Sequence, residues 1–227
     1  MLGFGKSPHS KNIVYSLKHH VNAVIETLDL ANVRRCTIVG YSLSCSLALH
    51  LSATHPAAIT STLLICPTLY GSFTQADIHI YKTGDMPRWL LDGKLSQFAC
   101  RFVCQNPILA IPIYRIMARN VPLRIRDDAR HHSWQSYRQT LDNIGINYRP
   151  QADFANLTTP LKIIIGDADA SIDHSFLNQM NNSNSLISIE TITAGKHQLP
   201  HQYPQIMTKQ IIDLARNSKC YTVPNEK

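Results

Sequence analysis

Residues 37 to 49 read Thr-Ile-Val-Gly-Tyr-Ser-Leu-Ser-Cys-Ser-Leu-Ala-Leu, and they carry the strongest local pattern in the chain. The run from Cys36 to Val39 is short, apolar and β-branched, which predicts a strand that stops at Gly40. Residues 44 to 54 are rich in small and apolar side chains and predict a helix that ends before His55-Pro56. A single serine, Ser42, therefore lies on a sharp turn between a strand and a helix.

This turn has the sequence features of a nucleophile elbow, in which a strand–turn–helix exposes a reactive serine. The geometry requires small residues two before and two after the serine, because larger side chains would collide with the neighbouring backbone. Gly40 fits this requirement, and Ser44 replaces the usual glycine but is still small. The alternative is a serine-rich turn that merely caps a helix.

The segments on both sides of the elbow extend the alternation of helices and strands. Residues 16 to 28 have helical spacing of apolar side chains, and residues 62 to 66 form a second apolar run stopped by Pro67. The order helix, strand, helix, strand predicts a parallel sheet with helical crossovers. Further along, residues 161 to 165 and 187 to 192 predict two more strands, and residues 175 to 180 and 205 to 216 predict helices. We therefore expect four regions along the chain: a first part of the hydrolase-like core with the serine turn at 1–69, a helical cap insertion at 70–150, a second core part at 151–220 and a loose tail at 221–227.

The composition is that of an ordinary globular domain, with 44% hydrophobic and 16% charged residues among 227. Residues 71 to 150 hold eleven Lys/Arg against six Asp/Glu and so carry most of the net charge of +7. A dense basic run is missing, which argues against nucleic acid as a partner. No apolar run is long enough to span a membrane, and the opening residues do not resemble a signal peptide, so we expect a cytoplasmic protein.

The cysteines do not have the spacing of a zinc site or of a disulfide framework, and we expect no metal. Cys36, Cys45 and Cys66 sit in or beside apolar segments and are expected to be small buried residues. Cys100 and Cys104 are one helical turn apart, and we expect them to be reduced packing residues rather than a bridge.

Four motifs, in order along the chain, resemble those of the α/β-hydrolase superfamily. Besides the elbow, they are Leu-Gly-Phe-Gly-Lys-Ser at 2–7, the strand and turn LKIIIGDAD at 161–169, and Ala-Gly-Lys-His at 194–197. The resemblance implies an α/β fold of the α/β-hydrolase type: an incomplete, mainly parallel sheet with a helical cap insertion. The order nucleophile, acid, histidine is that of the superfamily.

Carried over to this chain, the resemblance implies that Ser42 is the nucleophile and His197 the general base. Asp169 would orient the imidazole, and the backbone N–H of Leu43 would supply one oxyanion donor. No cofactor is implied, and the resemblance identifies no substrate-binding residues. The expected reaction is hydrolysis of ester-like or related carbonyl substrates through an acyl-enzyme. A non-catalytic or truncated hydrolase-like protein with a binding role is the alternative.

Each role has rivals nearby in the sequence. Asp167 is expected to cap the strand end and Asp173 to face water, so Asp169 is favoured because it completes the Gly-x-x-Asp spacing. His201, four residues after His197, is expected to be a surface histidine because no glutamate completes a metalloprotease motif. The pairs 19–20 and 131–132 are also expected to be solvated.

The cap contains apolar residues that favour an apolar small-molecule substrate: 89–91, Phe98, Phe102 and 108–116. The same residues would also serve simply to pack the cap against the core.

Members of the superfamily normally place further strands and a second oxyanion donor before the Gly-Phe-Gly segment, and these have no counterpart in the 227 residues. We therefore expect the Thr37–Val39 strand to have an open side. The expected consequences are poor solubility, self-association or dependence on a partner at that edge, and weak esterase activity. A fragment, a truncated protein that pairs at this edge and a non-catalytic remnant are the three explanations left open.

Overall fold

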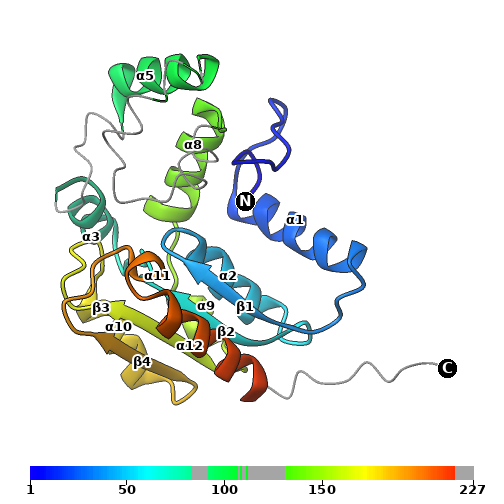
Figure 1. The fold of residues 1–227 in the computed structure, drawn as a ribbon, viewed down its shortest axis with the longest axis vertical. Helices are drawn as coiled ribbons and strands as arrows, with labels where there is room; N and C mark the ends of the chain where they lie inside the picture. Colours follow the sequence, from blue (N-terminus) through cyan, green and yellow to red (C-terminus); the bar gives the residue numbers. More distant parts are fainter. Residues whose placement is uncertain (83–91, 107, 109–110, 112–130, 218–227) are drawn as a thin grey trace.

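Four parallel strands form the centre of the molecule (Figure 1). The computed structural model describes residues 1–82, 92–106, 108, 111 and 131–217. The strands lie in the order β1 (Cys36–Tyr41), β2 (Ile59–Ile65), β3 (Leu161–Gly166) and β4 (Ile187–Ile192). This arrangement confirms the predicted α/β class and parallel sheet, and each strand lies within two or three residues of the run that predicted it.

Helices cover both faces of the sheet (Figure 1). In this view α12 (Pro204–Asn217) crosses the front of the strands, whereas α2 (Ser44–Thr54) and α10 (His174–Ser183) lie behind them. The main core lies between these layers and includes the fully buried side chains of Leu49, Leu63 and Ile163. The remaining core helices are α1 (Leu17–Leu30), α9 (Gln151–Ala155) and the short α11 (Leu199–Gln202).

A second group of helices comes between β2 and β3 in the sequence. It consists of α3 (Phe73–Asp77), the π-helix η1 (Ile78–Lys82), α5 (Gly93–Gln105), α8 (Trp134–Thr140) and the π-helix η2 (Leu141–Ile146). Figure 1 shows α5 and α8 standing above the sheet. Residues 89–91 and most of 108–116, which we expected in the apolar part of a cap, lie outside the described residues. The boundaries of the cap stay a prediction.

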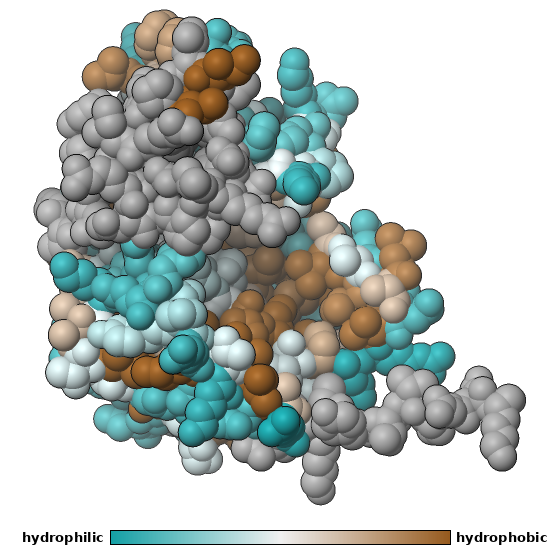
Figure 2. Space-filling view, viewed as in Figure 1, coloured by the Kyte–Doolittle hydropathy of each residue, from teal (hydrophilic) through white to brown (hydrophobic). Residues whose placement is uncertain are grey.

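The strand that leads to Ser42 lies at the edge of the sheet. Within the described residues β1 pairs with β2 alone, and the side chain of Val39 is 38% exposed. Figure 2 shows apolar surface over β1 and its neighbours, and Ile206 and Ile212 of the adjacent α12 are also among the exposed large apolar side chains. Among the helices of the described ranges, none has both the length and the apolar character needed to cross a bilayer.

One histidine that we expected in solvent is instead buried. His20, on α1, is 1% exposed, and its Nδ1 accepts a hydrogen bond from the backbone N–H of Leu2 at 3.2 Å. Its Nε2 lies 3.2 Å from the hydroxyl of Thr140 on α8. The prediction of a solvated pair at 19–20 is therefore wrong for His20, because α1 turns this residue toward the opening loop and α8. Burial lowers the pKa of His20 from 6.5 to about 4.

Candidate active site

Ser42 stands on a strained turn at the end of β1. Its φ angle is +55°, in the left-handed region that non-glycine residues seldom occupy. The turn is held to the sheet by a hydrogen bond of 2.9 Å from the N–H of Ser42 to the carbonyl of Ile65 on β2. Strain of this kind costs on the order of 1–3 kcal/mol and is concentrated at functional sites. The geometry is that expected of a serine presented by an elbow.

The two small residues that flank Ser42 have different roles. A Cβ atom at Gly40 would lie 2.8 Å from Cα of Cys45, so the turn leaves no space for a side chain there. Ser44 has room for its side chain, and its hydroxyl accepts from the N–H of Tyr41 at 2.9 Å and donates to the carbonyl of Tyr41 at 2.8 Å. The departure from glycine at position 44 therefore adds two local hydrogen bonds to the elbow.

The loops that carry Asp169 and His197 are joined to each other at two glycines. A Cβ atom at Gly166, the last residue of β3, would lie 2.2 Å from the carbonyl oxygen of Gly195. That oxygen accepts a hydrogen bond of 3.0 Å from the N–H of Ala168. Because β3 and β4 are parallel neighbours, their carboxyl ends deliver both loops to the same edge of the sheet.

The three predicted side chains meet in one hydrogen-bonded series. Ser42 Oγ lies 2.7 Å from His197 Nε2, and His197 Nδ1 lies 2.7 Å from Asp169 Oδ2. An ionised carboxylate only accepts hydrogen bonds, so Nδ1 carries the proton and Nε2 is left to accept the serine O–H. The arrangement is that of a serine activated by a base that is itself oriented by an acid.

Asp169 is almost completely buried, with 3% of its surface exposed. Burial raises the pKa of its carboxyl, but the hydrogen bonds from His197 and from Ser171 outweigh burial and hold the pKa below the ordinary value. The N–H of Ser171 donates to Asp169 Oδ1 at 2.9 Å. A carboxylate is therefore present beside the imidazole of His197 at neutral pH.

Two residues that the sequence did not point to also adjoin this series. The hydroxyl of Tyr41 donates to the carbonyl of His197 at 3.0 Å and fixes the loop that carries the imidazole.

The thiol of Cys66 lies beside Asp169, and burial, followed by the charge of Asp169, raises the pKa of this thiol to about 12. Cys66, Asp169 and His197 place possible metal-ligand atoms within 4.8 Å of one another. The hydrogen bond from His197 to Asp169 accounts for the proximity of two of the three.

Leu43, the expected oxyanion donor, is the N-cap residue of α2 and has αR backbone angles of φ −58° and ψ −32°. Its side chain packs beneath η2, since a Cβ atom at Gly145 would lie 3.1 Å from Leu43 Cδ1. The hydroxyl of Ser46, one turn into α2, also donates to the carbonyl of Ile144 at 3.2 Å. The start of α2, where the amide of Leu43 lies, is therefore held in place by η2.

The rival residues occupy other places. Asp167 is exposed just after β3, and its N–H donates to Ile192 at 3.3 Å. Asp173, which we expected to face water, is 4% exposed and caps α10 by accepting from the N–H of Phe176 at 3.0 Å. That expectation is wrong because the N-terminus of α10 is buried and needs a side-chain acceptor. His201 is half-buried in α11.

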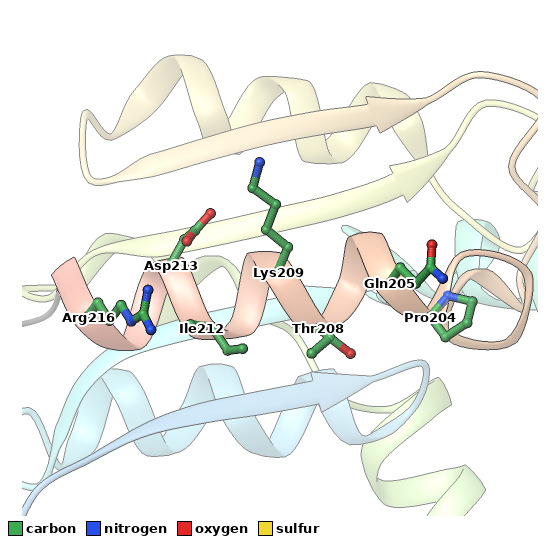
Figure 3. Close-up of a pocket in the computed structure, with 7 residues that line it drawn as sticks. All are labelled: Pro204, Gln205, Thr208, Lys209, Ile212, Asp213 and Arg216. Carbon is green, nitrogen blue, oxygen red and sulfur yellow. The ribbon is translucent and has the colours of Figure 1, made fainter.

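An open depression of about 620 Å³ runs along α12, and Figure 3 labels the seven residues that line it. Thr208 and Ile212 point to one side of the helix, and Lys209 and Asp213 point to the other. Ser42, Asp169 and His197 do not line this depression. It is therefore separate from the serine–histidine–aspartate series.

Comparisons with known proteins find the same fold, and distant sequence similarity, among hydrolases. No protein-family model matches the chain. Probable lysophospholipase BODYGUARD 3 of Arabidopsis thaliana is 42% identical over 71 residues, which are 31% of this chain and 14% of that protein. Probable lysophospholipase BODYGUARD 4 of the same plant is 24% identical over 87% of the chain, and the chain spans about half of that protein's length (51%). The crystal structure of a hydrolase from Pseudomonas aeruginosa PA01 has a TM-score of 0.66 and 21% identity, covering 93% of this chain and 76% of that one.

Proposed function

The chain belongs to the α/β-hydrolase superfamily, and from this premise we propose that it hydrolyses carboxylic esters or related carbonyl substrates through an acyl-enzyme. The observation that carries the proposal is the series in which His197 lies 2.7 Å from both Ser42 and Asp169. A serine hydroxyl is a weak nucleophile near neutral pH, and a positioned base removes its proton as it attacks.

In the proposed reaction Ser42 Oγ bonds to the carbonyl carbon of the substrate while His197 Nε2 takes the hydroxyl proton. The carbonyl oxygen becomes an oxyanion, which the N–H of Leu43 stabilises. His197 then returns the proton to the leaving alcohol, and the C–O bond of the ester breaks. Water repeats the sequence on the acyl-enzyme, releasing the acid and restoring Ser42.

The proposed substrate class is esters with an apolar acyl group. The curated relatives bear the name probable lysophospholipase, and an acyl ester bond is the group that such an activity would cleave. Among the described residues between β2 and β3, Phe98 is 69% exposed and Phe102 is 40% exposed, so apolar side chains are available on α5. We propose lysophospholipids and other long-chain monoesters as the first substrates to assay.

Labelling with a fluorophosphonate probe tests the nucleophile. We expect covalent labelling of the wild-type chain and none of Ser42→Ala, since no other serine is paired with His197 in the described residues. Ser183→Ala is the matched control, because this exposed serine on α10 only donates to the carbonyl of Met180 at 2.8 Å. Labelling that persists in Ser42→Ala would overturn the proposal.

Hydrolysis of p-nitrophenyl esters of increasing acyl length and of a lysophosphatidylcholine then tests the substrate class. Removal of the nucleophilic serine from a serine–histidine–aspartate triad typically lowers kcat by about 10⁶-fold, and we expect a loss of this order in Ser42→Ala. A wild-type chain that folds and binds these lipids, but is not labelled and does not hydrolyse them, would favour the alternative of a non-catalytic binding protein.

A further inference from the structure

Two cysteines of α5 and a histidine just before α8 form a cluster that shares no residue with the serine–histidine–aspartate series. Cys100 Sγ lies 3.9 Å from Cys104 Sγ and 3.3 Å from His132 Nε2. All three ligand atoms lie within 4.8 Å of one another, and the three residues are half-buried. The cysteines are one turn apart on α5, and His132 stands two residues before α8.

We propose that Cys100, Cys104 and His132 form a binding site for Zn²⁺. Thiolate sulfur lies about 2.3 Å from zinc and imidazole nitrogen about 2.0–2.1 Å. At tetrahedral angles these bond lengths separate two sulfurs by about 3.8 Å, and a sulfur from a nitrogen by about 3.6 Å. The separations of 3.9 and 3.3 Å are within a few tenths of an ångström of these values, and the third pair of ligand atoms, of Cys104 and His132, lies within 4.8 Å.

The histidine is held by contacts that do not involve the cysteines. The backbone of His132 forms an isolated antiparallel bridge with Phe4, and the N–H of Gly5 donates to the carbonyl of His131 at 2.7 Å. The rings of Phe4 and His132 are stacked, with centroids 6.1 Å apart and planes 18° from parallel. The opening loop therefore positions the imidazole, as supporting contacts do for metal-binding histidines.

A disulfide between the two cysteines explains the cluster less well. The sulfur separation of 3.9 Å is far from the bond length of about 2.05 Å, and a bridge gives no reason for the imidazole nitrogen beside Cys100. Soft thiolates together with imidazole are the donor set that zinc prefers over magnesium or calcium. The site uses three of four tetrahedral positions and leaves the fourth for a water molecule or another ligand.

The proposed role is structural. Leu95 is 60% exposed and Phe98 is 69% exposed, so one side of α5 faces outward rather than into a core. An ion held by two residues of α5 and by His132 would join this helix to α8 and to the Phe4 loop. Binding to the folded chain alone would also stabilise it by mass action.

Alkylation of the 227-residue wild-type chain tests the site without any substitution. The chain, reduced and freed of metal, is treated with iodoacetamide with and without one equivalent of Zn²⁺, and the modified cysteines are identified by mass spectrometry. We expect zinc to slow modification of Cys100 and Cys104 at least tenfold and to leave Cys36 unaffected. Equal rates at Cys100 and Cys104 with and without zinc would overturn the proposal, as would a Cys100–Cys104 disulfide found in the purified chain before reduction.

Cobalt spectroscopy then identifies the ligands. Co²⁺ bound to thiolates in a tetrahedral site gives visible d–d bands and a sulfur-to-metal charge-transfer band. We expect Cys104→Ser and His132→Gln to weaken Co²⁺ and Zn²⁺ binding by at least about tenfold, the loss typical of removing even a supporting partner. Cys36→Ser and His131→Gln are the matched controls and should bind as the wild type does. A charge-transfer band that survives Cys104→Ser and disappears in His197→Gln would instead assign the metal to the group around Cys66, and would refute this site.

Discussion

Acid should destabilise this protein through one buried histidine. His20 is 1% exposed, and its Nδ1 accepts the N–H of Leu2, so a proton on Nδ1 would place two donors against each other. Burial lowers the pKa of His20 from 6.5 to about 4. Between these two values the unfolded chain binds a proton that the folded chain does not, and the free energy of unfolding therefore falls as the pH falls. Above pH 6.5 the stability is fully present, and below pH 4 this loss is complete.

The size of the effect follows from the two pKa values. Each pH unit between them is worth about 1.4 kcal/mol, so lowering the pH from 7 to 4 should cost roughly 3 kcal/mol through His20 alone. That is a large part of the 5–15 kcal/mol, in order of magnitude, that stabilises an ordinary domain. Other groups titrate in the same range, so the measurement must compare two proteins that differ at this position.

Urea unfolding of the wild type and of His20→Gln, at half-unit steps from pH 7.5 to pH 4.5, isolates the contribution. Glutamine keeps one acceptor and one donor but cannot titrate, so the variant should lose less stability on acidification than the wild type does. His131→Gln is the matched control, because His131 is exposed and is distant in sequence from His20, so its variant should follow the wild-type curve. Parallel curves for wild type and His20→Gln would refute the reasoning, as would an NMR titration in which His20 takes up its proton near pH 6.5.

Three further substitutions test the architecture of the candidate site. Gly166→Ala places a Cβ atom 2.2 Å from the carbonyl oxygen of Gly195 and should lower the free energy of unfolding by about 3 kcal/mol. An unchanged midpoint in urea unfolding would contradict this. Asp169→Asn should lower ester turnover by about 10⁴-fold while some activity remains, because the imidazole is left in the wrong tautomer; undiminished kcat would dismiss the carboxylate's role. Ser44→Gly removes both hydrogen bonds to Tyr41 and should lower the unfolding free energy by about 1–2 kcal/mol, whereas a stabilised variant would show that the hydroxyl does not support the elbow.

The parallel core could be predicted from the sequence because its signals are local. Residues 44 to 54 were predicted as a helix and form α2 with the same limits, and the run 161–165 became β3 with one more residue. The elbow was equally visible, since the requirement for small residues at positions 40 and 44 is a property of the turn itself. The spacing of Gly166 and Asp169 likewise indicated which carboxylate follows β3.

What the sequence could not predict depends on contacts between distant segments. Asp173 was expected in water, and nothing in its neighbours indicates that α10 begins in the interior. The same holds for His20, whose partner Thr140 is 120 residues away. The proximity of His132 to Cys100 could not be predicted for a similar reason. The two residues are 32 positions apart, which matches no common zinc motif, and only the folded chain brings them together.

The hydroxyl of Ser44 also sets a limit to how far the sheet can grow. Along β1 the N–H groups of Cys36 and Ser42 point toward β2, so the odd-numbered residues between them direct their backbone groups to the open side. At the last of these, Tyr41, a side chain already occupies both backbone groups. A strand from another molecule could therefore pair along the first part of β1 but would have to stop before the turn. The hydroxyl oxygen of Ser44 therefore ends strand pairing one residue before Ser42. A dimer that formed along β1 should leave the surroundings of Ser42 as they are in the single chain.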